Sequence, residues 1–433
     1  MTTILAISVF IISYYFIMTE KINRATVALA GGMLLLLTQV YTWETVITKY
    51  IDWHTIALLF AMMVLVGITK NTGVFSFIAI RLAKVVKGDP KKLLIGVGLL
   101  TAIGSALLDN VTTVLLFVPI IITLTTMLKQ PTFPYLITII ITSNIGGTAT
   151  LIGDPPNIMI GQAVPHITFA SFLQHTAPIS IVILVITLTL LYYLFRKQLK
   201  PIEIDDIKKL KLMNEREHLK KSPLLYQSVS ILILTIIGFI LHPIIHMDIT
   251  MIALSGAILL LLCSDKELLT EKVFEQVEWI TLFFFIGLFM LVGGLQEVGV
   301  IDEIARSIMW VTGGDMSNTA LLLLWTSGVL SGVVDNIPFV AAMIPVIQEF
   351  ESYGMANLDP LWWSLALGAC LGGNGSLIGA TANVVVAGLA EAQNKKIEFV
   401  KYLKYGIPIV LLSLVIATIY IYFRYLVPFE QSL

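Results

Sequence analysis

Charged side chains and cysteines are both scarce in this chain, and each scarcity excludes a class of protein. Only 13% of the 433 residues are charged, whereas 57% are hydrophobic and the mean hydropathy is +0.91. A soluble chain of this length could not cover so much apolar surface with so little polar material. The net charge of −1 lacks the basic excess of a nucleic-acid-binding protein. The two cysteines, Cys263 and Cys370, lie in apolar surroundings and predict no disulfide framework.

Long apolar runs recur along the whole chain, and they predict an all-α polytopic membrane protein. A helix needs roughly 20 residues to cross ~30 Å of hydrocarbon. The candidate crossings are 4–18, 25–41, 53–69, 134–161, 171–195, 224–241, 249–263, 279–296, 361–390 and 405–427. The first run lacks a basic leader and a small-residue cleavage site, so we interpret it as a retained helix.

Two further apolar blocks, 93–128 and 319–347, each carry an Asp-Asn pair near the centre. Each block is either two crossings or one re-entrant hairpin, and both courses return the chain to the side it came from. With the N-terminus outside, all but three of the 27 Lys and Arg fall in inner loops or beside them; the exceptions are Lys49, Arg306 and Arg424. This asymmetry predicts a multi-pass protein of the cytoplasmic membrane with both termini outside.

A duplication runs through the chain at an offset of 226 residues. The stretch Leu-Asp-Asn-Val-Thr at 108–112 returns as Val-Asp-Asn-Ile-Pro at 334–338. The same offset pairs Trp53 with Trp279 and Asn157 with Asn383, and six of the fifteen positions in 143–157 are identical to their counterparts. A carboxylate is costly in hydrocarbon, so its recurrence at corresponding places predicts a duplicated membrane site.

The two copies are expected to be inverted relative to one another. Trp53 begins a helix that enters from outside, whereas Trp279 begins one that enters from inside. The sequence thus predicts a first repeat over 1–196, a cytoplasmic linker over 197–222 and a second repeat over 223–433. Amphipathic segments at 72–87 and 298–311 are expected to lie at opposite membrane interfaces.

The Asp-Asn pairs are the first candidate for site chemistry. Asp109-Asn110 and Asp335-Asn336 would begin the second arm of each hairpin, where either residue type can cap a helix. Serine would cap without a charge, and a bare Asp in hydrocarbon costs about 2.5–3.5 kcal/mol. We therefore expect these pairs, together with Thr112, to contact an ion or a substrate.

The second candidate is the stretch 143–157, Ser-Asn-Ile-Gly-Gly-Thr-Ala-Thr-Leu-Ile-Gly-Asp-Pro-Pro-Asn. Its glycines and prolines predict a break in the helix, which is tolerated at membrane depth only beside a cavity or inside protein. Asp154 and Pro155 fit the cap and first position of a restarted helix. The residues expected to line the site are Asn144, Gly146, Gly147, Thr148, Asp154 and Asn157 in the first copy and Gly372, Gly373, Asn374, Ser376 and Asn383 in the second.

Asp154 has no acidic counterpart in the second copy, where the equivalent residue is Ala380. Because a desolvated carboxyl can exchange protons near neutral pH, Asp154 is our candidate handle for a proton or cation. We expect no Lys or Arg near these elements, so a multiply charged carboxylate would meet no fixed cation. Two Na⁺ positions are predicted, formed by Asp109, Asn110 and Gly146 and by Asp335, Asn336 and Gly372. No cofactor is expected beyond a coupling ion, H⁺ or Na⁺.

The Asp-Asn pairs and the stretch Asn-Ile-Gly-Gly-Thr…Gly-Asp-Pro-Pro-Asn at 144–157 resemble the ArsB/NhaD permease family of the ion transporter superfamily. That group includes arsenite exporters, sodium–proton antiporters and the P protein. The resemblance implies re-entrant hairpins, broken helices, and a homodimer in which a transport domain moves like an elevator. The chain departs from relatives with Ser-Asn-Thr at the hairpin tips, because it has Asp109 and Asp335 there; acidic tips disfavour a dicarboxylate substrate.

The resulting hypothesis is a secondary active transporter in the lipid bilayer. It would couple the export of arsenite, or a similar small inorganic solute, to protons or sodium. Sodium–proton antiport is the alternative within the same class. From other classes, Gly153-Asp154 faintly resembles the motif of an intramembrane aspartyl protease, and a channel is a further option.

Overall fold

The fold consists of helices throughout the part of the chain that the structure describes. The structure is a computed structural model, and it describes all residues except 1, 20, 221, 265–269 and 428–433. Among the described residues it contains no β-strand, which confirms the predicted all-α class. Nine of the described helices are long and apolar enough to cross a membrane. The chain is therefore a multi-pass membrane protein.

The helices follow the predicted apolar runs, and several runs are interrupted. The first half contains α1 (Thr2–Thr19), α2 (Arg24–Leu37), α3 (Trp43–Thr45), η1 (Val46–Tyr50), α4 (Trp53–Asn71), α5 (Val74–Val85), α6 (Pro90–Leu107), α7 (Asn110–Met127), α8 (Thr132–Thr148), α9 (Pro155–Ala163), α10 (Phe169–His175) and α11 (Ala177–Phe195). Between the halves lie α12 (Ile204–Leu212) and η2 (Glu215–His218).

The second half follows the same order. It contains α13 (Pro223–Ile245), α14 (Ile249–Ser264), α15 (Thr270–Phe274), α16 (Trp279–Glu297), α17 (Val300–Thr312), α18 (Met316–Val333), α19 (Asn336–Glu349), α20 (Asp359–Gly372), η3 (Gly373–Gly375), α21 (Thr381–Ala392), α22 (Phe399–Ile421) and η4 (Tyr422–Leu426). The blocks with Asp-Asn pairs form the helical hairpins α6–α7 and α18–α19. Their re-entrant course stays a prediction.

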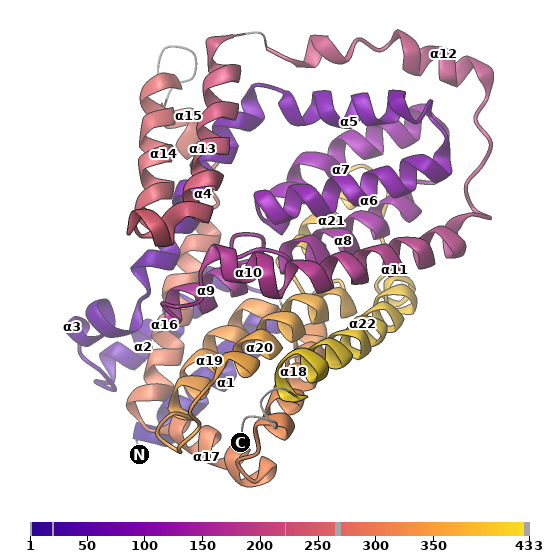
Figure 1. Ribbon diagram of the computed structural model, residues 1–433. Coiled ribbons are helices and arrows are strands. Elements are labelled where there is room, and N and C mark those ends of the chain that lie inside the picture. The colour runs from indigo at the N-terminus through magenta and orange to yellow at the C-terminus, as the bar shows by residue number, and fades with distance from the viewer. Residues whose placement is uncertain (1, 20, 221, 265–269, 428–433) are drawn as a thin grey trace.

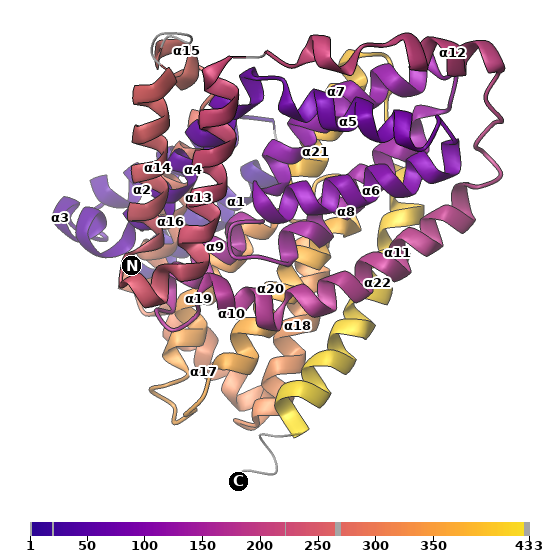
Figure 2. The same ribbon diagram turned by 45° about the horizontal axis from the view of Figure 1, so that its top comes forward.

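Two groups of helices differ in their direction through the molecule. Figures 1 and 2 show α4, α13 and α14 standing together at one side, and in Figure 1 α16 lies below them. The hairpins, the broken helices and α11 and α22 run obliquely beside this group. The Asp-Asn hairpin tips and the helix breaks belong to the oblique group, whereas α4 and α16 begin at Trp53 and Trp279 in the upright group.

Helix boundaries repeat at the offset seen in the sequence. Helices α6 and α18 have 18 residues each, and α7 and α19 begin at the equivalent residues Asn110 and Asn336. Gly73 and Gly299 precede α5 and α17 with φ of 79° and 76°, a conformation that glycine adopts without a steric penalty. Helices α5 and α17 lie at opposite ends of the molecule (Figures 1 and 2), as an inverted pair would. The inversion itself stays a prediction.

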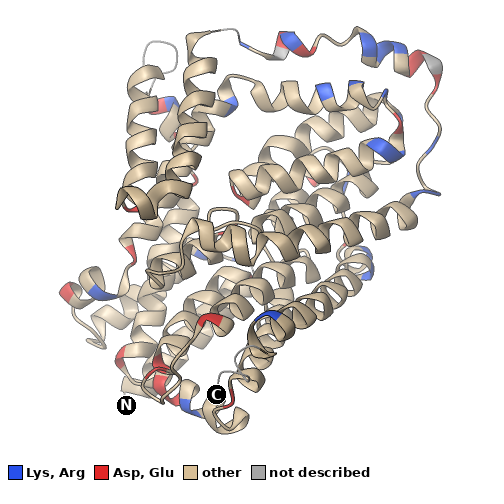
Figure 3. Ribbon diagram, in the orientation of Figure 1, with Lys and Arg blue, Asp and Glu red and all other residues tan. Residues whose placement is uncertain are grey.

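The linker between the halves is attached to the first half more closely than its charged sequence indicates. Glu215 is 8% exposed and accepts hydrogen bonds from Lys84 and Arg81 on α5. The hydrogen bond from Lys84, with that from Arg81, lowers the pKa of Glu215 to about 2. The Gln130 side chain also exchanges two hydrogen bonds with the backbone of Lys200. Figure 3 shows many of the Lys and Arg residues, drawn in blue, at this end of the molecule.

Candidate functional site

Each helix break is held open by one asparagine at the start of the following helix. Asn157 donates to the carbonyls of Gly147 and Thr150 at 3.1 and 2.9 Å. Asn383 donates to the carbonyls of Gly373 and Ser376 at 2.7 and 2.8 Å. Both side chains are buried, so these bonds satisfy backbone oxygens that no water reaches. The predicted breaks are present, and their shared bonding pattern follows the 226-residue offset.

The two breaks meet through a cluster of buried amides. Asn144 on α8 donates to Asn374 Oδ1 and to Asn383 Oδ1, each at 2.9 Å. Asn110 at the first hairpin tip donates to Asn144 Oδ1 at 3.3 Å, and its own buried Oδ1 has no hydrogen-bond partner among the described residues. Residues from both halves thus form one neutral polar cluster, in which the Asn110 oxygen is an acceptor available to a cation or a hydroxyl.

Cys370 belongs to this cluster, which the sequence alone did not indicate. It is the counterpart of Asn144 at the 226-residue offset, and its thiol donates to Asn157 Oδ1 at 3.4 Å. Asn144 contacts Asn383 in the same way, so each break is joined to the other by an equivalent pair. The repeat would have revealed the position, because Cys370 stands where the first copy has a site asparagine.

Asp154 lies in the first break, and its buried carboxylate accepts few hydrogen bonds. The residue is 1% exposed, and Pro155 is the first residue of α9, as predicted. Its side chain makes no capping hydrogen bond; it accepts instead from Asn336 Nδ2 at 3.2 and 3.4 Å. The tip of the second hairpin therefore contacts the break of the first half. A buried carboxylate with so few donors can bind a proton or a cation.

The two hairpin-tip aspartates differ in their surroundings. Asp109 caps α7 by accepting from the backbone and hydroxyl of Thr112 at 2.7 and 2.6 Å. Its backbone φ of +138° is one that residues other than glycine adopt only under strain. Asp335 has an ordinary φ of −51° and accepts from the Ile337 amide. Both aspartates thus act as caps, the alternative that the sequence left open, and the first is held in a strained backbone.

The expectation that no basic side chain lies near the site is wrong. Arg24 at the start of α2 donates to Asp335 Oδ2 at 3.1 Å and to Thr381 Oγ1 at 2.7 Å. Thr381 in turn donates to the same Asp335 oxygen at 2.8 Å. The count of basic residues placed Arg24 in an inner loop, just before the apolar run 25–41, but in the structure it begins α2 and contacts the second hairpin tip.

The remaining predicted residues lie in the breaks with mainly structural contacts. A Cβ on Gly146 would lie 2.2 Å from the Ala102 carbonyl oxygen, and one on Gly372 would lie 2.4 Å from that of Gly328. The Gly146 carbonyl still accepts the Ala149 amide, so α8 continues past it. Thr148 donates to the Asn144 carbonyl, and Ser376 accepts the Ile378 amide. In the second Asp-Asn pair, Asp335 accepts a hydrogen bond from Arg24 and Asn336 donates one to Asp154.

Two clefts separate the upright helices from the second arms of the hairpins. One, of about 210 Å³, lies between α16 and α19 and is lined by Lys49, Tyr50, Asp52, Gln162, Gln296 and Gln348, among others. The other, of about 40 Å³, lies between α4 and α7, and its polar lining is Lys70, Thr112, Gln276 and Glu278. Tyr50 and Asp52 correspond to Gln276 and Glu278 at the 226-residue offset, so the clefts are equivalent places in the two copies.

Comparison with known proteins yields consistent matches over nearly the whole chain. A transporter of Mycobacterium bovis described as uncharacterized is 37% identical over 430 residues, which is 98% of this chain and 99% of that protein. The P protein of Mus musculus is 32% identical over 494 residues, covering 96% of this chain and 59% of the relative. The crystal structure of the YdaH transporter of Alcanivorax borkumensis matches with a TM-score of 0.59 at 11% identity, covering 95% and 97% of the two chains.

The structural match shows a shared fold only, because the identity is low. The relatives from Mycobacterium bovis and Synechocystis are described as transporters, which sets aside the aspartyl protease alternative. Membership of the ArsB/NhaD group in particular stays a prediction. The family model described as citrate transporter, CitMHS, matches residues 14–368. The chain therefore belongs to the CitMHS family, and it is a membrane transporter rather than an enzyme.

Proposed function

We propose that the protein is a secondary active transporter that couples export of a small, oxygen-rich inorganic solute, arsenite being our first candidate, to H⁺ or Na⁺. The observation that carries this proposal is the buried Asp154 carboxylate. It lies at a helix break, makes no cap, and receives hydrogen bonds from a hairpin tip of the other half. A structural carboxylate in that place would be expected to carry a basic partner or a full set of donors.

The coupling step uses Asp154 and its contact with Asn336. Neutralising the carboxylate, by a proton or by a sodium ion, removes the cost of moving a bare charge through the membrane. The Asn336 amide donates to the carboxylate at 3.2 Å, so the charge on Asp154 bears directly on the second hairpin tip. Binding of a proton or a sodium ion to Asp154 would thereby change how readily that hairpin tip moves.

The amide cluster supports a neutral solute. Donors and acceptors without net charge are offered by Asn110, Asn144, Asn374 and Asn383, and no described residue donates to the Asn110 oxygen. Arsenite at neutral pH is mainly an uncharged trihydroxyl molecule, whose hydroxyl groups suit amide partners. An amide oxygen is equally a ligand for Na⁺, so sodium–proton antiport remains the alternative function of the same residues.

Citrate is a second candidate substrate, favoured by the family description and by Arg24. The guanidinium now pairs with Asp335 at 3.1 Å, and a substrate carboxylate would have to compete with that partner. Three aspartates stand around the site, so a trianion would need accompanying cations. Arg24 makes the candidate worth testing, but the amide cluster fits arsenite better.

The two equivalent clefts support movement of the oblique helices against the upright ones. Each cleft lies between an upright helix and the second arm of a hairpin, and their volumes are about 210 and 40 Å³. Opening one as the other closes would give the site access to each side in turn. We propose that this movement is elevator-like and that the protein works as a homodimer in the cytoplasmic membrane, with both termini outside.

Flux measurements on purified protein in proteoliposomes separate the candidates. Arsenite, Na⁺ and citrate are each loaded on one side, with and without a pH gradient, and their movement is followed. We expect arsenite flux that rises with the imposed H⁺ or Na⁺ gradient. Sodium exchange for protons without arsenite flux would favour the antiporter, citrate flux would favour the second substrate, and currents far above carrier rates would indicate a channel.

A further inference from the structure

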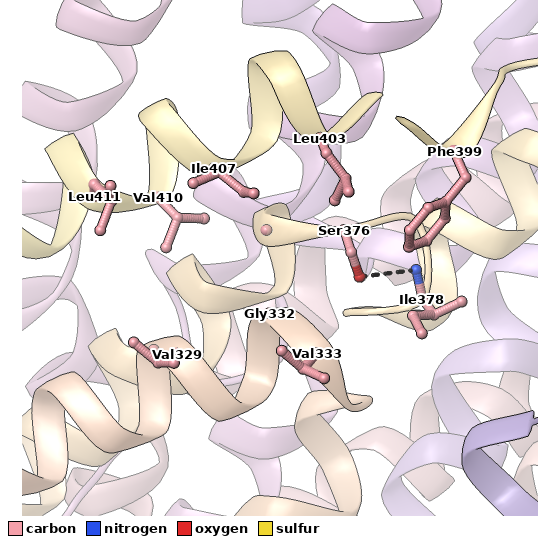
Figure 4. A pocket seen from close by; sticks show the side chains of 12 residues that line it. Val329, Gly332, Val333, Ser376, Ile378, Phe399, Leu403, Ile407, Val410 and Leu411 are labelled. Carbon is pink, nitrogen blue, oxygen red and sulfur yellow. Dashed lines mark hydrogen bonds between the residues drawn. The ribbon is translucent and has the colours of Figure 1, made fainter. Parts of the chain in front are cut away.

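An apolar groove of about 430 Å³ runs along the outside of the second half. It lies between α18 and α22, and its floor is the irregular segment that follows η3 (Figure 4). Figure 4 shows Val329 and Val333 on one wall, facing Ile407 and Leu411 on the other. Among its lining residues Ser376 alone carries a polar side chain, and that hydroxyl is engaged by the Ile378 amide.

The walls of this groove are more exposed than a protein core allows. Val333 is 53% exposed, Val329 52% and Ile407 47%, and they belong to helices long and apolar enough to cross a membrane. The medium outside such helices is lipid hydrocarbon, so a groove of this volume and composition accepts an acyl chain.

Basic side chains mark one end of the groove. Phe399 and Leu403 line that end, where α22 begins, and Lys395, Lys396, Lys401 and Lys404 lie in the same short segment. Figure 3 shows basic residues, drawn in blue, at the start of α22. Lys401 is directed toward the Phe133 ring at 4.2 Å, and Lys396 pairs with Glu391 at 3.2 Å. Lys404 is exposed one residue beyond Leu403, where it can meet a phosphate.

We propose that the groove binds one acyl chain of an anionic phospholipid whose phosphate contacts Lys404. The apolar walls of the groove contact the acyl chain, and the lysines at one end favour a negatively charged headgroup over a zwitterionic one. The site is separate from the amide cluster and does not depend on which solute the protein carries.

The groove lies next to the residues that form the second helix break. Ser376 and Ile378 form its floor, and the Ser376 carbonyl is one of the two that Asn383 holds. On the other wall, Tyr402 of α22 donates to the Asn374 carbonyl at 2.9 Å. Asn374 and Asn383 are both partners of Asn144. An acyl chain bound in the groove therefore stabilises the second helix break from the lipid-facing side.

Photocross-linking tests the proposal on the full-length protein in nanodiscs. Phosphatidylglycerol and phosphatidylcholine, each with a photoreactive acyl chain, are compared, and the labelled peptides are identified by mass spectrometry. We expect phosphatidylglycerol to label the 329–333 and 399–411 segments several-fold more than phosphatidylcholine does. Equal labelling by the two lipids, or labelling spread evenly over exposed helices, overturns the proposal.

Two pairs of variants locate the chain and the headgroup. Val333→Trp fills the groove and should reduce labelling of 399–411 several-fold, whereas Leu262→Trp, on the 74% exposed Leu262 of α14, should not. Lys404→Gln should remove the preference for phosphatidylglycerol, and Lys401→Gln should retain it because that lysine is directed to Phe133. Unchanged labelling in Val333→Trp, or an unchanged preference for phosphatidylglycerol in Lys404→Gln, contradicts the proposal.

Discussion

Arg24 and Asp335 form an ion pair at 3.1 Å although 311 residues separate them. Their side chains are only 18% and 14% exposed, and Thr381 hydrogen-bonds to both. The pair joins the start of α2 to the tip of the second hairpin, so the hairpin cannot leave α2 without separating two partly buried charges.

Removing one partner of this pair should destabilise the protein more than removing both. Arg24→Ala leaves Asp335 unpaired, and we expect a loss on the order of 1–3 kcal/mol, below the value for a fully buried pair because some water contact remains. The double variant Arg24→Ala/Asp335→Asn should recover part of that loss. Thermal unfolding in detergent compares the two variants, and a double variant no more stable than Arg24→Ala would contradict the pairing.

Asp154→Asn should abolish the dependence of solute flux on an imposed H⁺ or Na⁺ gradient. The amide keeps the size of the side chain but binds neither a proton nor a cation with comparable strength. Asp89→Asn is a matched control, because Asp89 caps α6 through the Lys91 and Lys92 amides and asparagine caps equally well. Gradient-driven flux that survives in Asp154→Asn would assign coupling to another residue.

Asn144→Ala should weaken the joint between the two breaks. Its amide donates to Asn374 and Asn383, and truncation leaves buried oxygens without donors at a cost of about 1–3 kcal/mol. We expect a lower unfolding temperature together with a loss of transport. Thr138→Ala serves as control, since that buried hydroxyl bonds only to the Pro134 carbonyl of its own helix. Equal effects of the two substitutions would deny Asn144 a special role.

Alanine at Gly146 or Gly372 should force the broken helix away from the first arm of its hairpin. The added Cβ would meet backbone at 2.2 and 2.4 Å, respectively, and a shift of the backbone costs about 1–3 kcal/mol. Gly388→Ala on α21 has nothing within 4 Å and should be tolerated. Expression level and unfolding temperature provide the comparison, and a stable Gly146→Ala protein would refute the close packing.

Acid should release the linker from α5. The hydrogen bonds that Glu215 accepts from Lys84 and Arg81 lower its pKa from 4.5 to about 2. The stabilisation that these bonds give the folded protein is therefore complete above pH 4.5, where the carboxyl is ionised in both the folded and the unfolded state. The effect declines as the pH falls from 4.5 toward 2. The protection of the 215–218 amides, measured relative to their intrinsic exchange rate at each pH, should therefore be high at neutral pH and low in acid, and Glu215→Gln should be poorly protected at both. PH-independent protection in the unmodified protein would contradict this.

The helices and breaks were predictable because local composition determines them. Apolar length gave the crossings, and glycine and proline gave the interruptions before Pro155 and after Gly372. The repeated offset gave the equivalence of Asn157 and Asn383. These features depend on residues close together in the chain, which a single sequence displays directly.

The partners across the halves could not be predicted, because they depend on how the halves pack. Asp335 was expected beside Gly372, yet it faces Arg24, and Asn336 reaches Asp154 at 182 residues' separation. Both contacts join residues that share no motif. Cys370 was expected only to lie in apolar surroundings, where a lone thiol usually packs; in the structure it donates to Asn157.

The central claim is that Asp154 links solute movement to movement of an ion, and counterflow measures that link most directly. Proteoliposomes carry a pH dye or a sodium dye inside, and an arsenite gradient is imposed with no other driving force. The account predicts that the arsenite gradient drives a countermovement of H⁺ or Na⁺ in the unmodified protein and none in Asp154→Asn. Arsenite crossing with no ion movement, or the same ion movement in both proteins, would contradict it.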